Sequence, residues 1–195
     1  MSAFGTKRTS RHAQPMSAFG GKADMGVELA TCRLRPISDT MAGMEFIVRQ
    51  MGASDRAIWA EMRTALWPDE TPLTHAKMVH ELLGDGDSLS LIAEARDGIA
   101  LGFAEIAVRK YANGCNTRPV AFLEGVWVRP QFRRQGIGRR LLAHAETLLA
   151  ARGFRELGSD TWIDDCTSQA AHLAWGFSET ERVVYFRKIL KPPRR

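Results

Sequence analysis

The chain has 195 residues, of which 45% are hydrophobic and 25% are charged, a balance typical of one globular domain with a single sizeable core. No apolar run approaches the roughly 20 residues that a membrane-spanning helix needs, so we expect a soluble protein without a membrane partner. The three cysteines, Cys32, Cys115 and Cys166, are too few and too widely spaced for a disulfide framework or a zinc site. That pattern fits a reducing, cytoplasmic compartment.

The net charge of +5 comes from the two ends of the chain. Residues 1–44 hold six Lys and Arg against three Asp and Glu, and Lys191, Arg194 and Arg195 add three positive charges. Residues 45–190 hold 18 basic against 19 acidic residues, a net charge of −1. A near-neutral domain without basic patches that interleave with aromatics argues against nucleic acid as a partner.

Residues 1–44 differ in composition from the rest of the chain. The segment Met1–Lys7 recurs imperfectly as Met16–Lys22, and Gly, Ser and Ala are frequent without a sustained period. The segment lacks the apolar core of a secretory signal. We therefore divide the chain into a disordered leader or start-site extension over 1–44, a folded domain over 45–190 and a basic tail over 191–195.

The folded domain begins with a predicted strand over Glu45–Met51. Ser54 can cap a helix that runs to Leu66, and the helix would end at Trp67, which precedes a proline. Thr74 can cap a second helix, in which apolar residues recur with an i,i+4 spacing.

Three predicted strands occupy the centre of the sequence, over Ser88–Ala95, Ala100–Arg109 and Val120–Val128. An Asp-Gly pair between the first two indicates a hairpin. Under simple alternation the even-numbered residues of the third strand share one face, Glu124 among them. Gly125 inside this strand suggests a bulge, which would re-aim Glu124.

The remaining elements complete a mixed fold. A long helix is expected from about Gly136 to Arg152, then a short strand over Glu156–Asp160, a helix around Thr167–Trp175 and a final strand over Thr180–Ile189. The order β-α-α-β-β-β-α-β-α-β predicts an α/β (α+β) fold with a mixed, mostly antiparallel sheet flanked by helices.

The loop before the long helix has the features of an anion site. Gly136 and Gly138 allow close approach of the backbone, and the loop leads into a helix N-terminus, where free N–H groups favour anions. Several cations stand there although they oppose the helix dipole, namely Arg133, Arg134, Arg139 and Arg140. A negatively charged partner accounts for them, and a solvated basic turn is the alternative. Neither a Walker loop nor a dinucleotide-binding loop fits, because Gly-Lys-Ser/Thr is missing and Leu141 replaces the third glycine.

Arg133, Gly136 and Gly138, placed after a strand that ends at Val128, resemble the acetyl-CoA-binding motif of the GNAT superfamily of N-acetyltransferases. The predicted order of elements resembles that fold as well. Over about residues 45–190 the resemblance narrows to the aminoglycoside 6'-N-acetyltransferases. It is carried by Ala65–Trp67, Tyr111–Gly114, Pro119–Gly125, Gly158–Asp160 and Gly176–Phe186.

The resemblance implies that acetyl-CoA is the co-substrate, and no residue spacing indicates a metal. Backbone N–H groups of the loop would hold the CoA pyrophosphate, and the edge of the preceding strand would pair with the pantetheine arm. The residues implicated are Val126, Trp127, Val128, Arg133, Arg134, Gln135, Gly136, Ile137, Gly138 and Arg139.

The implied chemistry is direct attack of a neutral amine on the thioester. A backbone N–H at Val126 or Trp127 would polarise the thioester carbonyl. Glu124 is the expected base, directly or through water, and Tyr185 is a candidate to protonate the departing thiolate. The alternatives are a structural pair or an edge carboxylate for Glu124 and a packed strand aromatic for Tyr185.

A polycationic sugar substrate requires acidic side chains and aromatic faces. The residues that match the family in this respect are Trp67, Asp69, Tyr111, Glu124, Asp160 and Glu181. Each acid alone is compatible with a solvated surface charge, but as a set they favour a polycation site.

The resemblance therefore predicts an enzyme that acetylates the 6'-amine of aminoglycosides, confers resistance to them and, by analogy, forms a homodimer. Two alternatives stay open. The enzyme could act on another amine, such as a polyamine or a protein lysine, or the chain could be a non-catalytic acyl-CoA-binding module.

Overall fold

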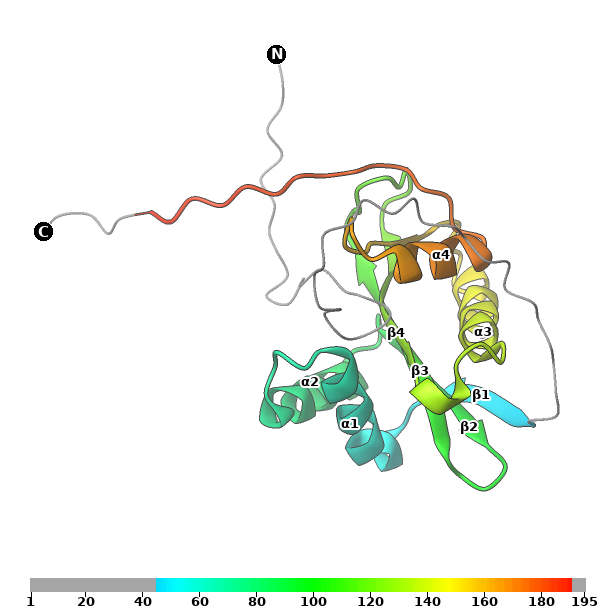
Figure 1. The fold of residues 1–195 in the computed structure, drawn as a ribbon. Helices are drawn as coiled ribbons and strands as arrows, with labels where there is room; N and C mark the ends of the chain where they lie inside the picture. Colours follow the sequence, from blue (N-terminus) through cyan, green and yellow to red (C-terminus); the bar gives the residue numbers. More distant parts are fainter. Residues whose placement is uncertain (1–44, 191–195) are drawn as a thin grey trace, which may run out of the picture.

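The computed structural model describes residues 45–190, which form one five-stranded sheet with helices on both faces (Figure 1). The strands are β1 Phe46–Gln50, β2 Leu89–Ala95, β3 Ala100–Arg109, β4 Val120–Val128 and β5 Leu157–Ser159. The helices are α1 Arg56–Leu66, α2 Pro72–Gly84, α3 Ile137–Ala151 and α4 Cys166–Ala174, with 3-10 turns η1 Ala53–Asp55 and η2 Pro130–Phe132.

The strand order follows the chain, from β1 to β5. Neighbours from β1 to β4 are antiparallel, and β5 joins β4 in parallel after the α3 crossover. The predicted fold class, a mixed and mostly antiparallel sheet flanked by helices, is therefore confirmed.

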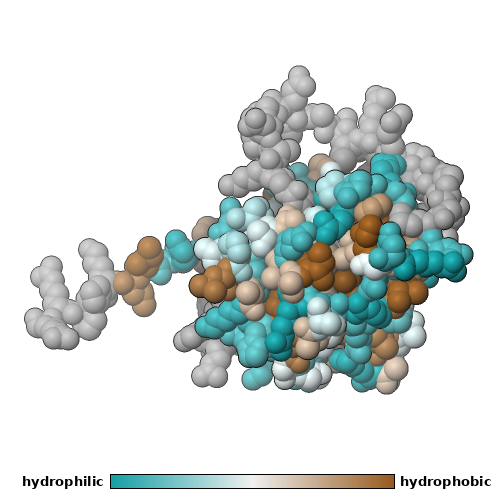
Figure 2. Space-filling model, turned by 90° about the horizontal axis from the view of Figure 1, so that it is seen from below, coloured by the Kyte–Doolittle hydropathy of each residue, from teal (hydrophilic) through white to brown (hydrophobic). Residues whose placement is uncertain are grey.

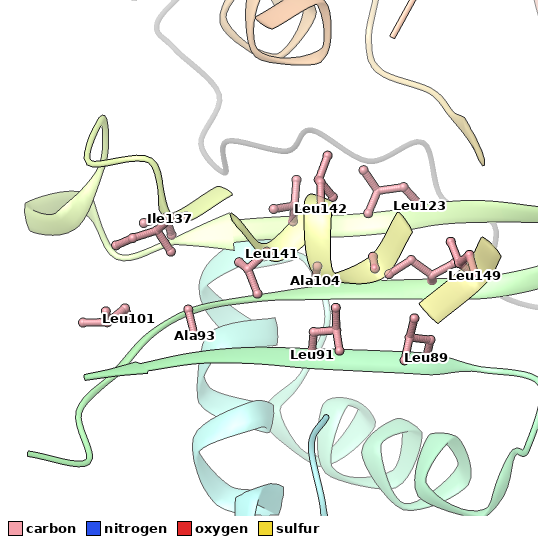
Figure 3. Close-up of a cluster of buried hydrophobic side chains, with 14 of the residues drawn as sticks. Leu89, Leu91, Ala93, Leu101, Ala104, Leu123, Ile137, Leu141, Leu142 and Leu149 are labelled. Carbon is pink, nitrogen blue, oxygen red and sulfur yellow. The ribbon is translucent and has the colours of Figure 1, made fainter. Parts of the chain in front are cut away.

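Two apolar layers hold the helices on the sheet. On one face, α3 places Leu141, Leu142 and Leu149 over strand residues that include Leu91 and Leu123 (Figure 3). On the opposite face, α1 and α2 bury a second cluster formed by Trp59, Met62, Leu66, Val79, Ile92, Ala100, Phe103 and Trp127. A fully buried side chain of this size contributes about 1.5–3 kcal/mol, so both layers fix the strands that carry the site.

A bulge interrupts β4 next to its partner β3. Glu105 lies opposite Gly125 and Ile106 lies opposite Leu123, so Glu124 is the extra residue. The predicted bulge is confirmed, and the simple alternation of side chains along this strand is wrong. Leu123 and Val126 both pack on the α3 face, because the extra residue resets the period of two.

Both predicted helix caps are displaced. Asp55, not Ser54, occupies the N-cap position of α1. The second helix begins three residues earlier than expected, because Thr71 is its cap and accepts a hydrogen bond from the backbone N–H of Thr74 at 3.2 Å. Pro72 suits the first turn of a helix, since its missing N–H would have no partner there.

The predicted final strand over Thr180–Ile189 is wrong. Residues 177–190 have no helix or strand, and from Thr180 to Leu190 every residue is exposed. A strand needs a neighbour for its backbone groups, and this segment runs away from the sheet as the red trace of Figure 1.

Two other expectations concern the ends of the chain. The predicted leader over 1–44 and the predicted basic tail over 191–195 lie outside the described residues. Within residues 45–190, no helix is both long enough and apolar enough to cross a membrane.

Candidate active site

The candidate site opens where β4 and β5 part. Strand β5 pairs with β4 only from Ala121 to Leu123, so the edge of β4 from Glu124 to Val128 has no strand partner among residues 45–190 on that side (Figure 1). Unpaired backbone groups on such an edge can accept an added strand-like ligand. The side chains of Val126, Trp127 and Val128 are buried, so only their backbone is available to such a ligand.

The loop after β4 ends in an uncapped helix. Arg134 has a φ of 63°, and Gly136, the N-cap of α3, has a φ of 77°. Within the described part of the chain no side chain caps this helix, while Ile137 anchors its first turn in the core. The N–H groups of the first turn therefore remain free of a capping side chain, which is the arrangement that binds phosphate groups.

Gly138 also has a packing role that its sequence position did not suggest. A Cβ at this position would lie 2.8 Å from Cζ2 of Trp175, at the end of α4. The missing side chain therefore allows α3 and Trp175 to approach closely. Close approach of a ligand is not needed to explain this glycine.

The arginines around the loop also brace it. Nε of Arg133 donates to the carbonyl of Val128 at 3.0 Å, and Nη2 of Arg139 donates to the carbonyl of Ala174 at 3.1 Å. The guanidinium of Arg140 lies 4.3 Å from the ring centroid of Phe46 in β1. These contacts give three of the four arginines a structural partner, and they leave the loop positively charged.

Glu124, the expected base, is held by an arginine that sequence reasoning missed. Arg109 donates from Nε and Nη2 to the two carboxylate oxygens of Glu124, at 2.7 and 2.6 Å. The guanidinium lies 3.4 Å from the ring centroid of Phe122. The side chain of Glu124 is still 21% exposed, so its remaining lone pairs can be reached from outside. The structural pair considered as an alternative is present, and it leaves room for a role in catalysis.

Asp160 and Glu124 follow the same register pair of the sheet. Leu123 and Ser159 form the last register pair of β4 and β5, so Glu124 and Asp160 are the residues that follow this pair in the chain. They flank the point at which the strands separate, and Asp160 is exposed there. The two expected acidic residues therefore both lie at the point where β4 and β5 separate.

Trp67 stands at the end of α1, packed among three other side chains. Its ring lies 4.4 Å from the guanidinium of Arg63, 6.3 Å from the stacked ring of His75 and 6.2 Å edge-on from Phe103. Strand alternation puts Phe103 and Arg109 on the same face of β3. Trp67, Arg109 and Glu124 therefore share the face that α1 and α2 cover.

Arg63, which contacts the ring of Trp67, belongs to a buried ion pair. Arg63 and Glu105 are 3% and 4% exposed and form a salt bridge, and Nε1 of Trp59 donates to Glu105 at 2.5 Å. Sequence reasoning passed over this pair. Glu105 in the middle of an apolar strand was the available signal, because a buried carboxylate requires a partner.

The other expected substrate residues are spread more widely. Tyr111 follows β3 and is 43% exposed, and Asp69 is exposed in the turn after α1. Glu181 and Tyr185 lie on the extended segment that leaves the sheet, so within one chain the structure does not bring them to the opening between β4 and β5 (Figure 1).

His172 on α4 forms a hydrogen bond with Ser159, the last residue of β5. Its Nδ1 lies 2.8 Å from the carbonyl of Ser168, so this nitrogen carries the proton and Nε2 accepts from the hydroxyl of Ser159 at 2.9 Å. Burial lowers the pKa of His172 below its ordinary value, which favours the neutral ring. Across residues 45–190, no group of three His, Cys, Asp or Glu side chains could hold a metal ion.

Comparisons with known proteins agree with this geometry. The profile of the Acetyltransferase (GNAT) family matches residues 57–177. Aminoglycoside N(6')-acetyltransferase type 1 of Stenotrophomonas maltophilia is 45% identical over 147 residues, which cover 74% of this chain and 94% of that protein. The protein of the same name from Serratia marcescens is 44% identical over 133 residues, 68% of this chain and 91% of that one.

Solved structures give the same result. AAC(6')-Iy in complex with the bisubstrate analog CoA-S-monomethyl-acetylneamine has a TM-score of 0.71 and 39% identity, over 75% of this chain and 99% of that one. AAC(6')-Ih from Acinetobacter baumannii has a TM-score of 0.71 and 36% identity, over 75% of this chain and its whole length. By sequence and by fold, this chain belongs to the GNAT family of acetyltransferases.

Proposed function

We propose that this chain transfers an acetyl group from acetyl-CoA to the 6'-amine of aminoglycosides. The feature that supports the proposal is the free edge of β4 from Glu124 to Val128, which begins where β5 ends before Asp160 and leads into the uncapped start of α3. The similarity to aminoglycoside N(6')-acetyltransferases, over more than 90% of the length of the two described above, supports the same substrate class.

The loop before α3 and the edge of β4 fit acetyl-CoA as the co-substrate. The N–H groups from Arg134 to Gly138 and the first turn of α3 suit a pyrophosphate, and Arg133 and Arg139 add positive charge beside them. The edge from Val126 to Val128 suits the pantetheine amides, since it offers backbone donors and acceptors. When bound, acetyl-CoA supplies an acetyl group that is activated as a thioester.

The protein groups then have separate tasks. The backbone N–H of Val126 or Trp127 hydrogen-bonds the thioester oxygen as negative charge develops on it. Glu124 accepts a proton from the substrate ammonium, directly or through a water, which frees the nitrogen lone pair. The new C–N bond forms as the C–S bond breaks, the nitrogen loses its second proton to become an amide, and the thiolate takes up a proton.

The pocket recognises a polycation through charge and aromatic faces. Asp69 and Asp160 supply negative charge, while the rings of Trp67 and Tyr111 offer flat surfaces to sugar rings. Arg109 neutralises part of this charge at Glu124. The acids that do not face Arg109 therefore carry the attraction for the remaining ammonium groups.

We further propose that the enzyme acts in the cytoplasm, as a homodimer, and confers aminoglycoside resistance. Cys115 and Cys166 are free thiols, which agrees with a reducing compartment. Acetylation removes one positive charge of the drug, which weakens its electrostatic attraction to RNA.

Free-thiol release from acetyl-CoA tests the proposed substrate class. The purified chain is incubated separately with a 6'-amino aminoglycoside, a polyamine and a lysine peptide. We expect turnover with the aminoglycoside at a kcat/KM at least 100-fold above the other two. A preference for the polyamine or the peptide would replace the substrate proposal, and acetyl-CoA binding without turnover on any amine would make the chain a binding module.

A further inference from the structure

His172 on α4 is a titratable side chain that takes part in none of the steps proposed above. Hydrophilic side chains cover much of the surface of this domain, shown in teal in Figure 2. The ring of His172 is instead half-buried, and its centroid lies 5.6 and 5.2 Å from the ring centroids of Trp175 and Phe177. A polar ring in such surroundings is held by specific hydrogen bonds, which decide how it can handle a proton.

The hydrogen bonds of His172 leave one ring nitrogen able to accept a proton. Nδ1 lies 2.8 Å from the carbonyl oxygen of Ser168, which can only accept, so Nδ1 carries the ring proton. Nε2 therefore keeps its lone pair and accepts the hydroxyl proton of Ser159 at 2.9 Å. The carbonyl of Leu123, the other acceptor near this hydroxyl, is at 3.4 Å and is weaker. A hydroxyl, an imidazole and a group that orients the imidazole form a chain along which a proton can move.

This chain begins at the point where β4 and β5 separate. Ser159 is the last residue of β5 and the register partner of Leu123, and the free edge of β4 starts at the residue after Leu123. Ser159 is half-buried, so it is not enclosed by the core. The other end of α4 reaches the phosphate loop, where Trp175 lies against Gly138. Helix α4 therefore runs between the candidate pyrophosphate site and the end of β5.

The electrostatic surroundings of His172 suit a group that takes up a proton and gives it back. Burial lowers the pKa of His172 below its ordinary value, so the ring is neutral and can accept a proton. The carboxylates of Asp160 and Asp165 act in the opposite direction and favour the charged ring. Once protonated, an imidazolium of lowered pKa is a stronger acid than an ordinary one, so it returns the proton readily.

We propose that Ser159 and His172 form a proton shuttle, which carries the second proton of the attacking nitrogen to the leaving sulfur. The oxygen of Ser159 accepts the proton from nitrogen while its own proton passes to Nε2 of His172. The imidazolium then returns a proton to Ser159, whose hydroxyl protonates the thiolate. One C–N bond forms, one C–S bond breaks and one proton moves from nitrogen to sulfur, so both residues end as they began. The shuttle rests on the proposed acetyl transfer, in which Glu124 takes the first proton.

Two variants of Ser159 separate the hydroxyl from the volume of the side chain. Ser159→Thr keeps the hydroxyl, whereas Ser159→Val has nearly the same shape without it. We expect Ser159→Thr to keep most of the wild-type kcat and Ser159→Val to lose about 100-fold, with the Kd for acetyl-CoA unchanged in both. His80→Gln, on the exposed side of α2, is the control and should keep wild-type kinetics. Wild-type kcat in Ser159→Val would overturn the shuttle.

His172→Gln separates proton transfer from hydrogen bonding, and it decides the matter if both Ser159 variants are equally slow. The amide can still hydrogen-bond Ser159 but cannot carry a proton, so kcat should fall about 100-fold while acetyl-CoA still binds. Wild-type kcat in this variant would overturn the shuttle. NMR of the imidazole nitrogens in the free protein needs no substrate and should show a neutral ring with its proton on Nδ1. A proton on Nε2 at neutral pH would equally overturn it.

Failure of the shuttle and failure of the proposed function give different results. If the wild type acetylates a 6'-amino aminoglycoside and His172→Gln is as fast, the shuttle alone is wrong. If the wild type acetylates a different amine, the substrate proposal is wrong, and the same variants are compared with that amine. Acetyl-CoA binding without turnover on any amine would overturn both.

Discussion

The guanidinium of Arg109 binds both carboxylate oxygens of Glu124, at 2.7 and 2.6 Å, at the bulge where β4 slips against β3. Two parallel charge-assisted hydrogen bonds fix the plane of the carboxylate. The free lone pairs of Glu124 are then aimed in one direction. We therefore regard Arg109 as the residue that positions the candidate base.

Substitutions at this pair should lower turnover and spare cofactor binding. Glu124→Gln removes the proton acceptor and should lower kcat by about 100-fold or more. Arg109→Met releases the carboxylate and should lower kcat by about tenfold, and Arg109→Lys, which keeps the charge, should recover part of the loss. Steady-state kinetics and acetyl-CoA titration measure these effects, with Glu146→Gln on the exposed side of α3 as the control. Wild-type kcat in Arg109→Met would remove the positioning role.

Alanine variants of two glycines distinguish the effect of backbone strain on stability from the effect on cofactor binding. Gly136 and Gly153 both have a positive φ, 77° and 87°, and each flanks one end of α3. Alanine at either position should lower the free energy of unfolding by about 1–2 kcal/mol, since L-residues are strained in this conformation. Only Gly136→Ala should also raise the Kd for acetyl-CoA. Equal affinities of the two variants would count against the cradle.

The buried pair behind Trp67 should be sensitive to the loss of one partner. Glu105→Gln leaves the guanidinium of Arg63 buried without its counter-charge and should destabilise the fold by about 3–5 kcal/mol. The double variant Glu105→Leu with Arg63→Met should be less destabilised than Glu105→Gln, because no charge is left unpaired. Urea unfolding of the single and double variants measures the difference. A double variant that is less stable than Glu105→Gln would contradict this account.

The central elements of the fold could be predicted from the sequence because their signals are local. The bulge beside Gly125 and the loop before α3 are both marked by glycines, which permit backbone conformations that other residues avoid. The Arg109–Glu124 pair could not be predicted in this way, since it depends on which residues a bulged register brings together. The segment Thr180–Leu190 has the composition of a strand, but composition alone does not show which strand it would pair with.

The stability of the domain should depend on His172 below neutral pH. Burial depresses the pKa of His172 below its ordinary 6.5, so the unfolded chain binds an extra proton in the window below that pH. This contribution to stability is complete above about pH 6.5 and is lost as the pH falls through the folded pKa.

Replacement of His172 by Gln should remove that component. The free energy of unfolding should then vary less steeply with pH below 6.5, by up to about 1.4 kcal/mol per pH unit. His80→Gln, on the exposed side of α2, should leave the slope unchanged. An unchanged slope in the His172 variant would show that another group titrates in this range.

The position of acetylation tests the central claim most directly. Two aminoglycosides that differ only in a 6'-amine or a 6'-hydroxyl are incubated with the protein and acetyl-CoA, and the products are analysed by mass spectrometry and NMR. We predict one added acetyl group, on the 6'-nitrogen of the first compound, and no product from the second. Acetylation of both compounds, or at any other nitrogen, would contradict the proposed function.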